Sequence, residues 1–435
     1  MTGVDSATES ALEAPRDCST PPASARATST QRLRRRKRKP IRRALIVTHR
    51  WSALTLGLLL VIQCTTGAIL LYHGELFRTS HPGFYQQSDA APAVSTEQAV
   101  GIVRTADPDF DIGWVGSDGG VIAVGDSGFT TAYAIDPGTG RINAHAALTD
   151  GILGWLVNLH DCAFGCPRFA GSIAAVNGKA PVLDVTWAYL ILGMLGLLLV
   201  ALAVSGALVW WPTLKRWRHG FRVRTNKGRF ARDRDLHNVI GIISVPFLLM
   251  WGITGVAFEF PSVERAWLAV TGGDAVTEMP EDTFTPRPAP SQGRRVSIDE
   301  ASTIALQRVP GRLAYLMLPS ENADYYRAAI AGAYSPYENR AFYSGDVLVY
   351  INAADSADIV VVDSSQDRPV ANTFYDKIFR PAHFGWLVNG WWRIIWLLLG
   401  LTPAALAATG VSTWLVKRRN TRNARALRAP PTSAA

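Results

Sequence analysis

The stretch HRWSALTLGLLLVIQCTTG, residues 49–67, decides the fold, because most side chains between its first histidine and its closing Thr-Gly are apolar. A second stretch, HNVIGIISVPFLLMWGITG at 237–255, has the same layout, and in both the glycine follows the histidine by 18 residues. A helix rises 1.5 Å per residue, so a run of about 20 apolar residues crosses about 30 Å of hydrocarbon. Each stretch therefore predicts a membrane helix with a histidine near one end.

Two more apolar runs accompany these stretches, in a chain of 435 residues of which 48% are hydrophobic and only 18% charged. A soluble protein carries no apolar runs of this length. The predicted fold class is an α-helical integral membrane protein with four transmembrane helices. The predicted spans are residues 44–72, 186–212, 237–260 and 384–416.

The net charge of +9 is concentrated in three basic clusters, at 32–43, 215–234 and 417–428. In a four-pass topology all three lie on one side of the membrane. The positive-inside rule therefore predicts a multi-pass protein of the cell (inner) membrane with both termini in the cytoplasm. No nucleic-acid partner is expected, because the clusters flank membrane helices and lack interleaved aromatic residues. The predicted cytoplasmic segments are residues 1–43, 213–236 and 417–435.

Residues 1–43 are rich in Ser, Thr, Ala and Pro and then in Arg, a composition that predicts a disordered tail. A cleaved signal peptide is the alternative interpretation of this tail and the first apolar run. The run is longer than an ordinary signal-peptide core and has no convincing small-x-small cleavage site. We therefore expect a retained membrane helix.

Two extracytoplasmic segments, residues 73–185 and 261–383, have the pattern of small α+β domains. Each contains a helical pattern, at 96–104 and at 297–308, followed by short strand-like runs. Asp-Pro-Gly-Thr-Gly at 136–140 predicts a turn between two of these strands. Each half of the chain thus consists of a helix, an extracytoplasmic domain and a helix, which indicates an internal duplication. The predicted strands are 121–124, 130–135, 141–143, 325–330, 346–352 and 358–362.

A second repeated feature is a small-residue pair near the end of the second and fourth spans. The pairs are Ser205-Gly206 and Thr409-Gly410, each with a tryptophan four residues after the glycine. A histidine precedes each of these spans, His160 in the first half and His383 in the second. The spacing is longer in the first half, because a segment containing Gly, Pro and Cys follows the histidine. The match supports the duplication.

Four cysteines are too few for a disulfide framework. Cys162 and Cys166 lie on the predicted oxidising side of the membrane, directly after His160. A structural disulfide between them is favoured there. A redox-active thiol pair is the alternative, which the four-residue spacing alone supports weakly.

Several motifs together resemble a known family. They are His-Arg-Trp at 49–51, the Thr-Gly that ends the first span, Ala-Tyr-Ala-Ile-Asp-Pro-Gly-Thr-Gly-Arg-Ile at 132–142, and Pro-Ala-His-Phe-Gly at 381–385. With these motifs, residues 44–416 resemble the PepSY-associated transmembrane helix family, whose members include membrane-embedded ferric-siderophore reductases. The resemblance implies four helices, two PepSY-like extracytoplasmic domains and two haem b groups per chain held by histidines.

On the predicted topology four histidines form two pairs, each at one level of the membrane. His49 and His237 lie at the cytoplasmic level, and His160 and His383 lie at the outer level. Two facing imidazoles would fill both axial positions of a haem iron, which favours electron transfer over oxygen binding. One such histidine alone is more often a polar helix cap, but four at matched levels indicate coordination. His73 is the competing ligand on the outer side.

Other residues of the spans could help to hold a haem. The Thr-Gly and Ser-Gly pairs, together with Gly57, Gly193 and Gly196, would let helices approach each other and leave room for a flat macrocycle. Arg50 and Arg393 are candidates for pairing with haem propionates. For each arginine alone, the ordinary explanation is that its side chain snorkels to the membrane interface.

A zinc site is a lesser alternative, since His160, Asp161, Cys162 and Cys166 form a local cluster of possible ligands. The sequence contains no Gly-x-Gly-x-x-Gly after a strand and no Gly-rich phosphate loop followed by Lys-Ser/Thr. We therefore expect electrons to come from a cytoplasmic partner or from quinol rather than from a nucleotide cofactor bound by this chain.

The leading hypothesis is a di-haem membrane oxidoreductase that passes electrons across the bilayer to an extracytoplasmic acceptor, with ferric siderophore iron as the expected acceptor. The chain would then be an enzyme, a haem-dependent transmembrane ferric-siderophore reductase. The rival hypothesis is a non-enzymatic membrane protein whose PepSY domains bind or regulate an envelope protease. A transporter is a third option, which four helices with few buried charges disfavour.

Overall fold

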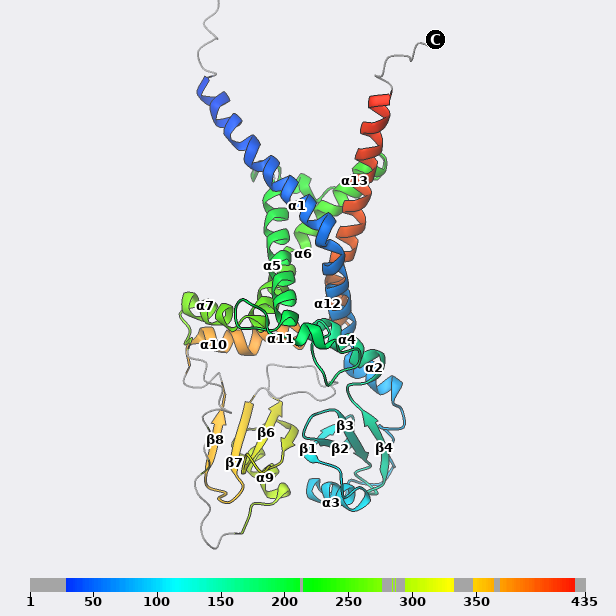
Figure 1. Ribbon diagram of the computed structural model, residues 1–435, viewed down its shortest axis with the longest axis vertical. Helices are drawn as coiled ribbons and strands as arrows, with labels where there is room; N and C mark the ends of the chain where they lie inside the picture. The colour runs from blue at the N-terminus through cyan, green and yellow to red at the C-terminus, as the bar shows by residue number, and fades with distance from the viewer. Residues whose placement is uncertain are drawn as a thin grey trace, which may run out of the picture. The chain divides into compact units, whose positions relative to one another are not determined.

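Figure 1 shows the fold as a computed structural model, which describes residues 29–211, 214–275, 284, 286, 294–331, 347–363 and 368–426. The chain divides into two compact units, Met1–Val47 and Thr48–Ala435. The described part of the first unit is the beginning of helix α1, and the other described elements belong to the second unit. Of the two predicted tails, residues 1–28 and 427–435 lie outside the described residues.

In the described part of the chain four helical segments are long and apolar enough to cross a membrane. Helices α5 and α6 lie side by side (Figure 1) and approach closely, because a Cβ on Gly196 would lie 3.1 Å from the carbonyl oxygen of Gly252. The predicted role of Gly196 in helix contact is thus confirmed, and Gly193 similarly faces the Phe260 ring. The four segments are α1 (Ser29–Leu70), α5 (Trp187–Trp210), α6 (Arg229–Glu259), and α12 (Trp392–Gly400) continued by α13 (Thr402–Ala426).

Two of the helices begin earlier than predicted, and α13 ends later. The prediction of a disordered tail up to residue 43 is wrong from Ser29 onward, and the predicted loop 213–236 is already helical from Arg229. Arg, Lys, Leu and Gln are good helix formers, so the basic runs continue the helices beyond the apolar spans. For the same reason α13 extends through part of the predicted tail 417–435, to Ala426.

The fourth span begins later than predicted. Residues 384–391 precede α12, and Gly385 and Gly390 in this segment have φ of 67° and 54°, which a helix cannot contain. The helix is broken again at Leu401, where Pro403 removes a hydrogen bond donor and crowds the preceding turn. His383 therefore lies on a separate short helix, α11 (Arg380–His383), rather than at the start of the span.

The strands of the described residues form one antiparallel sheet in the order β4-β3-β2-β1-β5-β6-β7-β8. The two predicted α+β domains are therefore joined, because central strands β1 and β5 pair with Val115 opposite Leu316. In Figure 1 the strands β1–β4 of the first half lie on one side of this seam and β6–β8 of the second half on the other. The strands are β1 (Ile112–Asp118), β2 (Val121–Asp126), β3 (Thr131–Ile135), β4 (Ile142–Ala147), β5 (Arg312–Met317), β6 (Tyr325–Ala331), β7 (Val347–Asn352) and β8 (Ile359–Val362).

Helices α3 (Thr96–Ala106) and α9 (Ile298–Arg308) pack on the sheet, one in each half. Helix α3 begins at the predicted residue and α9 one residue after its predicted start, with Ser95 and Ser297 accepting a hydrogen bond from the backbone three residues on. Their buried alanines and valines form one core with β1 and β5. The remaining elements are α2 (His73–Ser80), α4 (Gly151–Cys162), α7 (Pro261–Thr271), α10 (Val370–Phe374), and the turns η1 (Ala174–Asn177), η2 (Leu214–Phe221) and η3 (Tyr375–Phe379).

Two histidine pairs as a candidate metal centre

His49 lies in α1 and its ring packs against α5 of the same half of the chain. Its Nδ1 lies 2.9 Å from Oγ of Ser205. A Cβ placed on Gly206 would lie 3.3 Å from the Cε1 of this ring. The serine thus contacts one nitrogen of the imidazole, and the glycine leaves space for its edge.

His237 repeats this arrangement in the second half, between α6 and α13. Its Nδ1 lies 3.1 Å from Oγ1 of Thr409 and 3.1 Å from the carbonyl oxygen of Leu406. A Cβ on Gly410 would lie 3.4 Å from its Cε1. The rings of His49 and His237 have centroids 6.4 Å apart and planes at 89°. The structure therefore brings together the pair that the sequence predicted for the cytoplasmic level, although both residues lie inside their helices rather than at the ends.

His160 lies in the last turn of α4, and its ring packs against α1. Its Nδ1 lies 3.1 Å from Oγ1 of Thr66 and 2.9 Å from the carbonyl oxygen of Gln63. A Cβ on Gly67 would lie only 2.8 Å from the Nε2 of this ring, closer than any real Cβ contact. Only a glycine at residue 67 leaves room for the imidazole where it is.

His383, in α11, has the equivalent environment against α6. Its Nδ1 lies 2.7 Å from Oγ1 of Thr254, and a Cβ on Gly255 would lie 3.8 Å from its Cε1. The rings of His160 and His383 have centroids 6.5 Å apart with planes at 51°. The second predicted pair is therefore also brought together, despite the unequal spacing along the chain.

The hydroxyls of the Ser-Gly and Thr-Gly pairs have a role that sequence reasoning missed. The sequence predicts these pairs only as small residues, and it associates Thr66-Gly67 and Thr254-Gly255 with the histidine that precedes the glycine by 18 residues on the same helix. In the structure each hydroxyl contacts a histidine from a different helix. The recurrence of a hydroxyl residue before all four glycines is the signal that could have revealed it.

The separation within each pair fits one metal ion between two imidazoles. A bond from a metal ion to an imidazole nitrogen is about 2 Å long, so two imidazoles on opposite sides of one ion have ring centroids about 6 Å apart. The observed separations are 6.4 and 6.5 Å. Two axial imidazoles on one iron is the arrangement of electron-transfer haems.

A cavity of about 720 Å³ adjoins the second pair and is large enough for a planar macrocycle. His160 and His383 both line it, together with apolar side chains such as Leu60 and Leu199. The Phe258 ring also lines it, with its centroid 5.1 Å from that of His383. An apolar cavity with two imidazoles has the composition expected of a haem site.

Burial shifts the pKa values of several groups of this cavity. Burial, and then the nearby His160, lower the pKa of His383 to about 3, so its imidazole is in the neutral form that binds metals. Burial also lowers the pKa of His73, against the opposite effect of Glu75. Asp161 lines the cavity, and desolvation raises the pKa of its carboxyl, while His160 and Arg168 act to lower it.

His73, the competing outer ligand, opens α2 and lines the same cavity. Its ring stacks on Phe77, with centroids 6.4 Å apart and planes at 15°. The two imidazoles that face each other are those of His160 and His383. The geometry therefore favours these two residues over His73 as an axial pair.

The predicted arginines have different environments. The Nε of Arg50 is buried and has no hydrogen-bond partner among the described residues, which leaves it available to an anionic group. Arg393 is buried, forms an ion pair with Glu75 and lies 4.3 Å from the centroid of the Tyr72 ring, so it does not snorkel to an interface. Arg168, which sequence reasoning missed, lines the cavity beside the second pair. No pattern in the sequence distinguishes it from other surface arginines.

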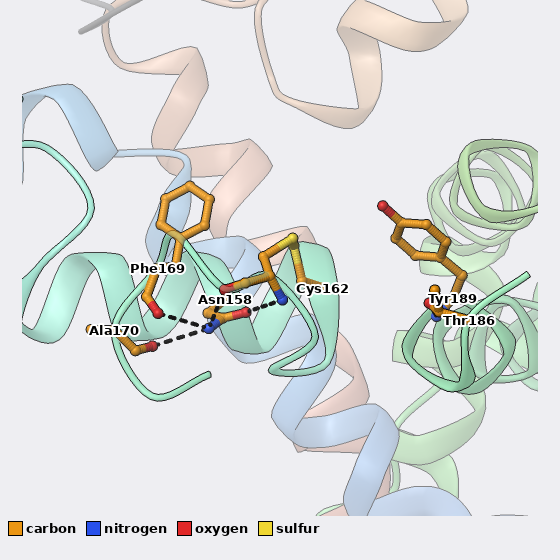
Figure 2. Close-up of a disulfide and its surroundings, with 7 residues drawn as sticks. Asn158, Cys162, Phe169, Ala170, Thr186 and Tyr189 are labelled. Atoms are coloured by element: carbon orange, nitrogen blue, oxygen red, sulfur yellow. Dashed lines mark hydrogen bonds between the residues drawn. A yellow bond between two sulfur atoms is a disulfide. The ribbon is translucent and has the colours of Figure 1, made fainter. Parts of the chain in front are cut away.

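Figure 2 shows how the chain after His160 is held in place. Cys162 and Cys166 form a disulfide. Buried Asn158 donates hydrogen bonds to the carbonyl oxygens of Cys166, Phe169 and Ala170 and accepts one from the backbone of Cys166. The favoured disulfide is thus present. The zinc alternative loses two of its four ligands, and among the described residues no group of three or more His, Cys, Asp or Glu side chains is placed to hold a metal ion.

Comparisons with known proteins agree with this architecture. The family described as PepSY-associated TM region matches residues 47–417. The uncharacterized protein PA4219 of Pseudomonas aeruginosa is 27% identical over 253 residues. That similarity covers 54% of this chain and 61% of the relative's length.

Proposed function

The chain belongs to the PepSY-associated TM region family, and from this membership and its two histidine pairs we propose that it is a di-haem membrane oxidoreductase. The observation that carries the proposal is the close contact of two imidazoles, which occurs twice, with ring centroids 6.4 and 6.5 Å apart. Two such pairs call for two haem b groups per chain. Bound there, each haem would supply reversible one-electron transfer.

The residues of the chain would perform two tasks. His49 and His237 would hold one haem, and His160 and His383 would hold the other, in a role suited to electron transfer. The unpartnered Nε of Arg50 is suited to a haem carboxylate at the first site. Arg168, on the cavity wall, is suited to the same task at the second site.

The matched environments of the histidines support an internal duplication. Each histidine contacts a hydroxyl residue followed by glycine in its own half of the chain. Each histidine pair, in contrast, combines one histidine from each half. The order of helix and four strands is also the same on both sides of the β1–β5 seam. We infer that the sheet consists of two PepSY-like domains.

The direction of electron flow follows from the predicted topology. The basic clusters favour a cytoplasmic location for both termini and the loop before α6 in the inner membrane, and an extracytoplasmic location for the sheet. The His49–His237 pair is then nearer the cytoplasm and the His160–His383 pair nearer the outside. Electrons from a cytoplasmic or quinol donor would reach an extracytoplasmic acceptor, for which we propose ferric siderophore iron.

Haem content tests the proposal. The protein purified in detergent should contain about two haem b groups per chain and show low-spin b-type absorbance bands after dithionite reduction. His237→Ala should lower the content to one, and His237→Ala with His383→Ala should abolish it. His145→Ala is the control, since that ring stacks on Tyr133 in the sheet. A folded wild-type protein without haem overturns the proposal and favours a binding role for the sheet.

A further inference from the structure

The hydroxyl groups that contact the four histidines are themselves oriented by their own helices. The Oγ1 of Thr66 donates to the carbonyl oxygen of Ile62 at 3.0 Å or of Gln63 at 2.9 Å, and that of Thr254 donates to Met250 at 2.7 Å. Thr409 and Ser205 donate in the same way to carbonyl oxygens of α13 and α5. A hydroxyl has one hydrogen, and a carbonyl oxygen can only accept. When the hydroxyl donates to its own helix in this way, it offers the histidine a lone pair, and the Nδ1 is then the donor.

Backbone carbonyl groups lead to the same assignment at two of the four rings. The Nδ1 of His160 lies 2.9 Å from the carbonyl oxygen of Gln63, and that of His237 lies 3.1 Å from that of Leu406. A carbonyl oxygen cannot donate, so these contacts also require a hydrogen on Nδ1. At these two rings the carbonyl contacts select the tautomer. The Gln63 amide also lies 3.2 Å from the Nδ1 of His160, and it donates at 2.7 Å to the backbone carbonyl oxygen of His160.

The glycines give all four rings the same orientation. In each case the Cε1 edge is turned toward the glycine, and the Nδ1 is turned toward the hydroxyl one residue earlier. None of the hydrogen bonds between described residues uses the Nε2 of these rings. The nitrogen that remains available is therefore Nε2 in all four.

We propose that Ser205, Thr66, Thr409 and Thr254 are positioning residues that hold His49, His160, His237 and His383 with the hydrogen on Nδ1, so that Nε2 is the metal-binding atom. The inference rests on the proposed haem function. A ligand imidazole that donates its other N–H to an oxygen becomes a stronger electron donor toward the metal. Each hydroxyl would thereby stabilise the ferric over the ferrous state of the haem that its histidine holds.

The four histidines differ in whether their Nδ1 has another hydrogen-bond acceptor besides the hydroxyl. Thr254 Oγ1, at 2.7 Å, is the one acceptor recorded for the Nδ1 of His383 among the described residues. His160 keeps the carbonyl oxygen of Gln63 if Thr66 loses its hydroxyl. Thr254→Val should therefore have a larger effect than Thr66→Val at the same site.

Reduction potentials measured by redox titration of the purified, haem-loaded protein test this inference. Thr254→Val should change the ferric-over-ferrous preference of one haem about tenfold, an upward shift of about 59 mV for one electron, and leave the other haem unchanged. Thr254→Ser should restore the wild-type potential, because it keeps the oxygen. Thr55→Val is the matched control, since the Thr55 hydroxyl donates only to backbone oxygens of α1.

The outcomes separate this inference from the proposed function. A wild-type protein without haem defeats both. A wild-type protein with two haems, in which Thr254→Val has the same two potentials as Thr55→Val, retains the function and overturns the positioning role. If Thr254→Val loses a haem, restoration of haem and potential by Thr254→Ser supports the role, and failure of that rescue shows that the threonine acts only by packing.

Discussion

At the scale of single residues, Gly67 has the least space of the four glycines beside the histidines. A methyl group there would lie 2.8 Å from Nε2 and 3.2 Å from Nδ1 of His160. Its neighbour Thr66 is tied to the same ring through a hydrogen bond, so the imidazole cannot move aside without losing that contact. The ring and the glycine thus define each other's position.

Gly67→Ala should therefore displace His160 and lower the haem content from about two to about one per chain. The added methyl group also overpacks the contact, which lowers the free energy of unfolding by about 1–3 kcal/mol. Gly57→Ala on the same helix is the control, because a Cβ there meets no atom within 4 Å, so the predicted helix contact at Gly57 is absent among the described residues. Pyridine haemochrome assay of both variants checks the prediction, and equal haem content in the two would contradict it.

The pairing of the histidines could be predicted from the sequence, whereas their contacts could not. The order of spans alone fixes which histidines share a membrane level, so the His49–His237 and His160–His383 pairs follow from topology. The contact of His160 with Thr66 depends on α4 folding back against α1, 94 residues earlier in the chain. No local pattern encodes a contact at that separation.

At the scale of elements, α4 depends on the loop that follows it. Asn158 is fully buried, and its amide satisfies three carbonyl oxygens and one backbone N–H. The disulfide spans only four residues of sequence, and closing so short a loop stabilises by about 2 kcal/mol. Each buried polar group that loses its hydrogen-bond partner lowers the free energy of unfolding by about 1–3 kcal/mol.

Asn158→Ala should consequently disturb this loop more than Cys162→Ser with Cys166→Ser. Hydrogen–deuterium exchange, measured by mass spectrometry over residues 158–173, compares the two variants with the wild-type protein. The exchange rates of the sheet serve as the internal reference. We expect faster exchange in both variants and the larger increase in Asn158→Ala. A larger increase in the serine variant would show that the disulfide, rather than the amide, holds the loop.

Local patterns predicted most elements but failed at the two strands that join the halves. Six strands and both capped helices of the sheet were located within a few residues. β1 and β5 were missed, since β1 contains two glycines and β5 has no clear alternation of apolar and polar residues. Both strands are central in the sheet, so neighbouring strands stabilise them more than their own propensities do.

At the scale of the whole molecule, the β1–β5 seam makes one sheet from two domains. Gly116 lies at this seam opposite Tyr315, and a Cβ on it would lie 3.1 Å from the Cα of that residue. The cores of the two halves are also continuous, since Val115 and Leu316 belong to one cluster. The two sets of four strands should therefore lose structure together.

Gly116→Val should increase amide exchange in β2–β4 and in β6–β8, although the substitution lies in β1. The valine forces the two central strands apart, so both halves lose their innermost pairing. Gly101→Ala in α3 is the control, because a Cβ there has open space and alanine favours a helix. Increased exchange confined to the first half would mean that the domains are stable independently.

Helices α1 and α6 each carry a histidine of one pair and a threonine that contacts a histidine of the other pair. The number of residues between the two therefore sets the separation of the two levels, which an electron would have to cross. α1 carries His49 and, 17 residues later, Thr66, and α6 carries His237 and Thr254 at the same interval. At 1.5 Å per residue the two levels are about 25 Å apart along the helix axis. That interval is a property of the covalent chain, independent of the thickness of the surrounding bilayer. Insertion of a single residue would rotate the Thr-Gly pair by about 100° around the helix and remove it from its histidine.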